Sequence, residues 1–207
     1  MEHSLVLFSI LGALLIGAIS PGPSFVFVVR TAVAQSRREG LAAALGMGVG
    51  AMLFGALAVL GLRTLIEDGG LLFTALKIAG GLYLVYLAWK IWSHAADPIT
   101  VETPGPATAN PRKAFTLGLL TQLSNPKIVA VFGAVFAALL PQNPDPWLYW
   151  SLPPLIFVQE TAWYAIVAVA FSASRPRALY LNAKIWVDRA AAVFIGVLGV
   201  RLIIEAR

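Results

Sequence analysis

The 207-residue sequence contains no cysteine, only two histidines, His3 and His94, and only 12% charged residues. Without cysteine the chain has no disulfide, thiolate metal ligand, redox relay or cysteine nucleophile. Both histidines lie outside the apolar stretches, which disfavours a histidine-based hydrolase and a buried histidine–metal site. We therefore predict no enzymatic activity and no cofactor. Soluble domains carry about 25% charged residues, so the scarcity of charge excludes an ordinary water-soluble domain.

Hydrophobic residues make up 59% of the chain, and each apolar stretch is long enough to cross about 30 Å of hydrocarbon as a helix. Their lack of polar–apolar alternation disfavours barrel strands. The sequence predicts a multi-pass, all-α integral membrane protein in the lipid bilayer, with residues 1–207 forming a single transmembrane domain. The first stretch lacks the preceding basic region of a signal peptide and is expected to be a retained span. The six predicted spans are Leu5–Val29, Leu41–Leu62, Gly70–Trp92, Ala114–Leu140, Trp147–Phe171 and Ile185–Ile204.

The formal net charge of +5 reflects cationic loops rather than nucleic-acid binding, because Lys and Arg accumulate in the cytoplasmic loops of membrane proteins. Three cationic residues, Arg63, Arg201 and Arg207, lie on one side of the predicted spans. The positive-inside rule therefore places both termini outside the cytoplasm. The connections after the first, third and fifth spans hold nine cationic residues, namely Arg30, Arg37, Arg38, Lys90, Arg112, Lys113, Arg175, Arg177 and Lys184.

The chain divides at a proline-rich cytoplasmic linker, residues 93–113, into a first repeat, 1–92, and a second, 114–207. An offset of 105 residues aligns Pro21 with Pro126 and Ser20 with Asn125. Three helices in each half give the halves opposite orientations in the membrane. The sequence therefore predicts two inverted three-helix repeats, an architecture found in many secondary transporters. The same offset pairs Leu14, Leu15, Val26 and Phe27 with Leu119, Leu120, Val131 and Phe132.

Prolines interrupt two predicted spans, at residues 20–24 (Ser-Pro-Gly-Pro-Ser) and 124–127 (Ser-Asn-Pro-Lys). Proline removes a backbone donor and clashes with the preceding turn, so each helix must break, and the freed carbonyls must face the bundle interior. Lys127 lies about twelve residues, roughly 18 Å, from the nearer end of its helix. A lysine so deep is costly, which favours a functional role. It could bind a substrate carboxylate, or form an ion pair with a protein carboxylate.

Glu160 is the only acidic residue predicted in the middle of a span. Three roles remain open for it: ion-pair partner of Lys127, carrier of a coupling proton, or receptor for a substrate ammonium. Asp188 and Arg189 are predicted in the first turn of the sixth span, at the cytoplasmic interface, where charge needs no functional explanation. The second span carries a face of small residues, Gly46, Gly50 and Gly55, which favours internal helix packing and is also compatible with a homodimer.

Three motifs carry a family resemblance: Pro21-Gly22-Pro23, then Arg38-Glu39-Gly40 before a glycine-rich span, then Asn125-Pro126-Lys127. With these motifs the chain resembles the LysE/RhtB family of amino-acid exporters. The likeness covers nearly the whole chain, including the Gly80-Gly81-Leu82-Tyr83-Leu84 stretch, and Ala88 stands where the family pattern has glycine. It implies export of amino acids or close derivatives through the bacterial inner (cytoplasmic) membrane by antiport driven by the proton motive force. Amino acids and protons are then the expected partners.

The combined hypothesis is alternating access around a site between the broken first and fourth spans. One rival is a membrane scaffold that uses the small-residue face to bind a partner helix and transports nothing. Another is an ion exporter, disfavoured because the spans lack histidine and cysteine and one mid-span Glu cannot enclose a hard cation. The predicted translocation path comprises Pro21, Gly22, Pro23, Gln122, Asn125, Pro126, Lys127 and Glu160.

Overall fold

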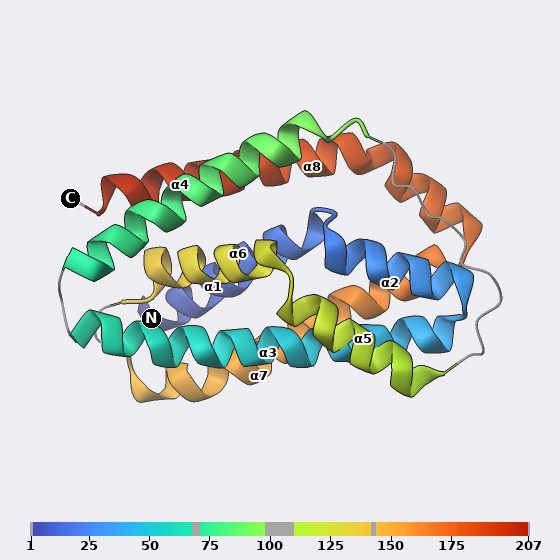
Figure 1. Ribbon diagram of the computed structural model, residues 1–207, viewed down its shortest axis with the longest axis horizontal. Helices are drawn as coiled ribbons and strands as arrows, with labels where there is room; N and C mark the ends of the chain where they lie inside the picture. The colour runs from blue at the N-terminus through green and yellow to red at the C-terminus, as the bar shows by residue number, and fades with distance from the viewer. Residues whose placement is uncertain (1, 68–70, 98–109, 142–143, 207) are drawn as a thin grey trace.

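The computed structural model describes residues 2–67, 71–97, 110–141 and 144–206. Within these ranges the chain forms eight helices and no strand, which confirms the all-helical prediction (Figure 1). The helices are α1 (Glu2–Ile19), α2 (Pro23–Ala34), α3 (Arg37–Glu67), α4 (Leu71–Ser93), α5 (Pro111–Leu123), α6 (Pro126–Leu139), α7 (Pro146–Phe171) and α8 (Ser174–Ile204).

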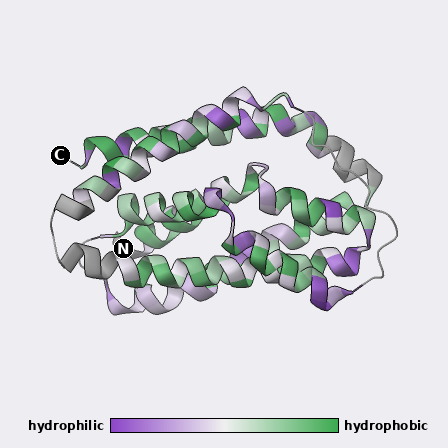
Figure 2. Cartoon of the chain, in the orientation of Figure 1, coloured by the Kyte–Doolittle hydropathy of each residue, from purple (hydrophilic) through white to green (hydrophobic). Residues whose placement is uncertain are grey.

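Two of the described helices are long and apolar enough on their own to cross a membrane: α3, over Arg37–Gly61, and α7. The pairs α1–α2 and α5–α6 also qualify if each pair is one broken span, bent by 58° and 56° respectively. The described part of the chain therefore contains between two and four candidate spans by length and composition. Hydrophobic residues run along the helices throughout the bundle (Figure 2).

The long helices form two packed sets, with α1, α2 and α6 between them (Figure 1). α4 lies along α8, while α3 lies along α7 and α5. The contact between α4 and α8 is closest at two glycines, because a Cβ added to Gly81 would lie 2.7 Å from the carbonyl oxygen of Gly199, and one added to Gly199 would lie 2.8 Å from that of Gly81. Side chains at these positions would separate the two helices.

The glycine face of the second predicted span is covered inside the bundle. A Cβ at Gly46 would collide with the carbonyl oxygen of Phe115 on α5. A Cβ at Gly50 would lie 2.8 Å from the Cβ of Gln122, also on α5, and one at Gly55 would lie 2.8 Å from Cδ1 of Ile156 on α7. Close backbone approach at small residues is a common basis for helix association in membranes.

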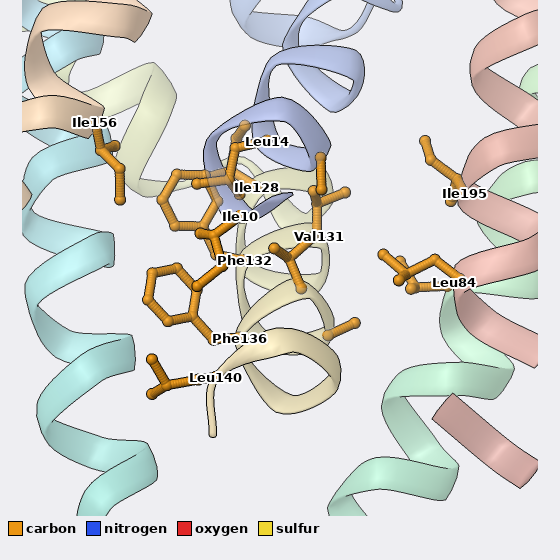
Figure 3. Close-up of a cluster of buried hydrophobic side chains, with 14 of the residues drawn as sticks. Ile10, Leu14, Leu84, Ile128, Val131, Phe132, Phe136, Leu140, Ile156 and Ile195 are labelled. Carbon is orange, nitrogen blue, oxygen red and sulfur yellow. The ribbon is translucent and has the colours of Figure 1, made fainter. Parts of the chain in front are cut away.

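One apolar cluster joins the two halves of the chain around the aromatic rings of α6 (Figure 3). Phe132 and Phe136 are at most 2% exposed, and their ring centroids are 6.3 Å apart. Lipid tails are as apolar as these side chains, so in a bilayer such a cluster stabilises the fold through close packing rather than removal from water. Labelled members from other helices are Ile10 and Leu14 of α1, Leu84 of α4, Ile156 of α7 and Ile195 of α8.

The start of the last helix was predicted wrongly. The apolar run begins at Ile185, but α8 begins at Ser174. Residues 174–184 are polar enough to end an apolar run, yet rich in Arg, Ala, Leu and Lys, which favour helix. Their single proline, Pro176, lies in the first turn, where a missing backbone donor costs little. Lys184 and Asp188 therefore lie well inside the helix rather than in a loop and a first turn.

Candidate functional site

Both predicted helix breaks are confirmed. α1 ends at Ile19 and α2 begins at Pro23, while α5 ends at Leu123 and α6 begins at Pro126. A proline suits the first position of a helix, because the backbone donor it lacks would have no intrahelical partner there and its φ angle is already helical. The same residue type thus ends one helix and starts the next at both breaks, and the two breaks meet near the centre of the bundle (Figure 1).

Side chains from three other helices donate to the last carbonyls of α1. Trp163 Nε1 of α7 donates to the Ala18 oxygen at 3.2 Å. The hydroxyl of Tyr180 on α8 donates to the Ile19 oxygen at 3.4 Å. Lys127 Nζ of α6 donates to the Ser20 oxygen at 2.7 Å. These bonds replace those lost at the helix end and confirm that the first break faces the bundle interior.

A second set of hydrogen bonds joins the two breaks directly. The Ser24 hydroxyl donates to Gln122 Oε1 at 2.6 Å and accepts from Asn125 Nδ2 at 2.8 Å. Asn125 also caps α6, since its Oδ1 accepts from the backbone nitrogen of Lys127 at 3.0 Å. Ser24, Gln122 and Asn125 are each at most 2% exposed. These hydrogen bonds through Ser24 hold the two breaks against each other in one arrangement.

Lys127 lies where the two breaks cross, and only 8% of its surface is exposed. It extends past Gly22, where an added Cβ would approach the lysine Cδ to 3.2 Å. The φ angle of Gly22 is −153°, an extended value open to any residue, so space rather than backbone freedom favours glycine here. The ammonium has three donors, and its hydrogen bond to Ser20 uses one of them.

Glu160 of α7 is 1% exposed, and neither of its carboxylate oxygens has a hydrogen-bond partner among the described residues. The direct ion pair with Lys127, one of the roles left open by the sequence, is therefore not formed in this conformation. Ser20 Oγ and Gln122 Nε2 are also buried without a partner. Buried polar atoms in folded proteins are almost always paired, so these atoms are available to a further ligand, a proton or water.

Six residues of the predicted path line one cavity of about 280 Å³, together with residues of α4 and α8. Gln122 and Glu160 are buried nearby and do not line it. The cavity therefore lies between the crossing of the breaks and the α4–α8 pair. The lining residues are Pro21, Gly22, Pro23, Asn125, Pro126 and Lys127 from the broken pairs, Tyr83, Tyr86, Leu87, Lys90, Ile91 and His94 from α4 and the residue that follows it, and Lys184 and Asp188 from α8.

Lys184 and Asp188 are the site residues that the sequence interpretation missed. It placed Lys184 in a loop and Asp188 at the membrane interface, whereas they are 8% and 4% exposed and joined by a 2.9 Å ion pair. The error follows from the start of α8. Their spacing of four residues was an available signal, because positions i and i+4 are neighbours on a helix face. No group of three or more His, Asp or Glu side chains in the described ranges could hold a metal ion.

Broken helices that meet around a buried charge, inside a bundle of apolar helices, are characteristic of secondary transporters. The chain belongs to the LysE type translocator family, whose model matches residues 15–206. This confirms the resemblance drawn from the motifs.

Two threonine efflux proteins are similar over almost their whole length. The one from Escherichia coli (strain K12) is 35% identical over 193 residues, covering 92% of this chain and 94% of the relative. The one from Salmonella typhi is 33% identical over 203 residues, covering 97% and 98%. A leucine efflux protein from Klebsiella pneumoniae is 30% identical over 136 residues, covering 62% of each chain. No solved structure matches the chain.

Proposed function

We propose that this protein exports amino acids or close derivatives from the bacterial cytoplasm through the inner membrane, as a secondary transporter driven by the proton motive force. The observation that carries the proposal is the buried Lys127 ammonium at the crossing of two broken helices, beside a cavity of small-molecule size. A deep lysine is expensive unless it serves a substrate or ion path. Amino-acid efflux is also what the names of the similar proteins describe.

In this proposal the membrane is crossed six times, because α4 with 23 residues and α8 with 31 have the length of a span. Corresponding helices of the two halves pack against each other, α3 against α7 and α4 against α8, while α1–α2 packs against α5–α6. Such pairing is expected of two inverted repeats related by a twofold axis. The cationic loops place the termini outside, and Lys90 and His94 then mark the cytoplasmic end of the cavity.

Lys127 binds the substrate carboxylate with the donors that Ser20 leaves free. Pro21, Gly22, Pro23, Asn125 and Pro126 form the walls of the path, and Gln122 holds the crossing through Ser24. Alternating access follows from movement of the α4–α8 pair against the broken helices, since the cavity lies between them.

Glu160 carries the coupling proton. Both of its oxygens are buried without a partner, a position in which an ionised carboxylate is costly and a protonated one is tolerated. Glu160 makes no side-chain hydrogen bond to the described residues that join the two breaks, so gain or loss of its proton breaks none of their bonds.

The scaffold alternative loses its main support, because Gly46, Gly50 and Gly55 contact α5 and α7 and are not free for a partner helix. Placing Lys127 and Glu160 inside the bundle would also serve no purpose in a scaffold.

Excretion from intact bacteria tests the proposal. Cells that overexpress the protein are fed mixed dipeptides, and the amino acids that appear in the medium are measured by mass spectrometry. Lys127→Ala should reduce excretion on the order of tenfold to a hundredfold, since a hydrogen bond to a charged group contributes about 1.5–3 kcal/mol. The matched control is Lys113→Ala, an exposed lysine of α5. Medium identical to that of an empty-vector strain, despite confirmed membrane expression, would refute amino-acid export. Unchanged excretion by both Lys127→Ala and Glu160→Gln would refute the site.

A further inference from the structure

The wall of the cavity opposite the broken helices carries a carboxylate with unused bonding capacity. Lys184 Nζ donates to Asp188 Oδ2 at 2.9 Å and to the carbonyl oxygen of Ala95 at 2.9 Å. The other oxygen of this carboxylate, Asp188 Oδ1, is buried and has no hydrogen-bond partner among the described residues. Asp188 is thus held in place through one oxygen while the second stays available to a ligand.

Asp188 and Lys127 line the same cavity from different helices, α8 and α6. Glu160 is not among the residues that line the cavity. Of the other cations that line the cavity, Lys184 is paired with Asp188 and Lys90 is exposed. A ligand inside the cavity therefore meets one buried cation without a carboxylate partner among the described residues, Lys127, and one buried anion, Asp188, from different helices.

Resting on the function proposed above, we propose that Asp188 binds the α-ammonium of the substrate through Oδ1, while Lys127 binds its carboxylate. An α-amino acid carries these two opposite charges on adjacent carbons, so a site with one cation and one anion recognises the zwitterion itself. The substrate side chain then faces α4, where Tyr83, Leu87 and Ile91 offer aromatic and aliphatic surface. The substrate class is neutral α-amino acids whose side chains carry no charge.

This assignment gives the two buried carboxylates different roles. Asp188 binds the substrate ammonium, and Lys184 is its ion-pair partner. Glu160 lies outside the cavity and has no such ion-pair partner among the described residues, and its role is to carry the coupling proton. A purely structural Asp188–Lys184 ion pair is the alternative, and it predicts no difference between ligands that carry an ammonium and ligands that lack it.

The test uses the purified full-length protein in proteoliposomes, with uptake of L-threonine and L-leucine and competition by the α-hydroxy acid analogue of each. These analogues keep the carboxylate and the side chain and replace the ammonium by a hydroxyl. The wild type should prefer the amino acid by at least about tenfold, as expected for a lost hydrogen bond to a charged group. In Asp188→Asn this preference should fall to about twofold or less. Asp97→Asn, which neutralises an exposed carboxylate outside the cavity lining, is the matched control, and it should keep the wild-type preference.

Asp188→Glu is a second test variant, to be used if Asp188→Asn does not fold. The longer side chain keeps the charge but moves it, so KM for the amino acid should rise at least about threefold while inhibition by the hydroxy acid stays constant. A preference unchanged from wild type in either folded variant would overturn the assignment. If the wild type transports amino acids, Lys127→Ala loses this transport and the Asp188 variants keep the wild-type preference, only the role of Asp188 is refuted. If the wild type transports no amino acid, the proposed function is refuted.

Discussion

The two helix breaks have similar bends, 58° and 56°, but they contribute different chemistry. The first break contributes a backbone group: the carbonyl of Ser20 accepts a hydrogen bond, and α2 begins at Pro23, where Gly22 is the N-cap residue and provides no side-chain cap. The second supplies side chains: Asn125 caps α6 and bonds across to Ser24, and Lys127 reaches the end of α1. Two breaks of the same shape therefore fit together because one fills the space that the other leaves open.

The difference is sharpest at one pair of positions. The offset of 105 residues that aligns Pro21 with Pro126 also aligns Gly22 with Lys127, and these two residues are in contact, with only 3.2 Å between the lysine Cδ and a Cβ placed on the glycine. The proposed twofold relation between the two halves would bring equivalent positions together in this way. There is room for one long side chain, so one half has glycine where the other has lysine.

The largest effect is expected from a second lysine at this contact. Gly22→Lys would bring two ammonium groups into one buried site, and two like charges 4 Å apart repel by about 4 kcal/mol at an effective dielectric constant of 20. Excretion of amino acids should fall more than a hundredfold, with protein abundance checked by immunoblotting of membranes. The double variant Gly22→Lys/Lys127→Gly restores a single lysine and should recover more activity than either single variant. Equal inactivity of all three variants would show that the positions are not interchangeable.

An intermediate effect is expected at the hydrogen bonds that join the breaks. Ser24→Ala leaves Gln122 Oε1 and Asn125 Nδ2 buried without this partner, which costs about 1–3 kcal/mol. Asn125→Ala removes the same bond and the cap of α6. Thermal unfolding in detergent of the two single variants and the double variant should give a coupling energy of about 0.5–3 kcal/mol. Strict additivity would mean that Ser24 does not connect the two halves energetically.

The smallest effect is expected from a methyl group at the first break. In Gly22→Ala the flexible Lys127 side chain can shift by a few tenths of an ångström, so we expect KM for export to rise about two- to fivefold with little loss of stability. Gly12→Ala on α1 is the matched control, since nothing lies within 4 Å of its added Cβ. An equal change in both variants would locate the cause in α1 as a whole rather than at the lysine.

The breaks could be predicted because proline acts locally, on its own turn of helix, whatever surrounds it. The deep position of Lys127 could be predicted for a similar reason, since the residues between it and the end of its apolar run can be counted along the chain. The partners of Lys127 could not be predicted. Its hydrogen bond to Ser20 joins residues 107 positions apart, and such contacts depend on how the helices cross.

Asp188 illustrates the opposite failure. An apolar run marks the part of a helix that is suited to lipid, not the residue at which the helix begins. α8 starts 11 residues before its apolar run. Asp188 lies well inside the helix, but the start of the apolar run placed it in the predicted first turn. The prediction of six spans rests on the same apolar runs, while the arrangement of α4 and α8 beside the cavity depends on packing at Gly81 and Gly199, which composition does not encode.

In the proposed function, the hydrogen bond from Lys127 to Ser20 also governs how firmly the substrate is held. With no cargo present, the ammonium already has an acceptor at 2.7 Å, so the vacant protein does not bear the full cost of a bare buried cation. An arriving carboxylate competes with that carbonyl and gains only the difference between two interactions. Weak net binding of this kind favours rapid release of the substrate on the far side of the membrane and rapid return of the empty transporter. The turnover rate depends on both steps.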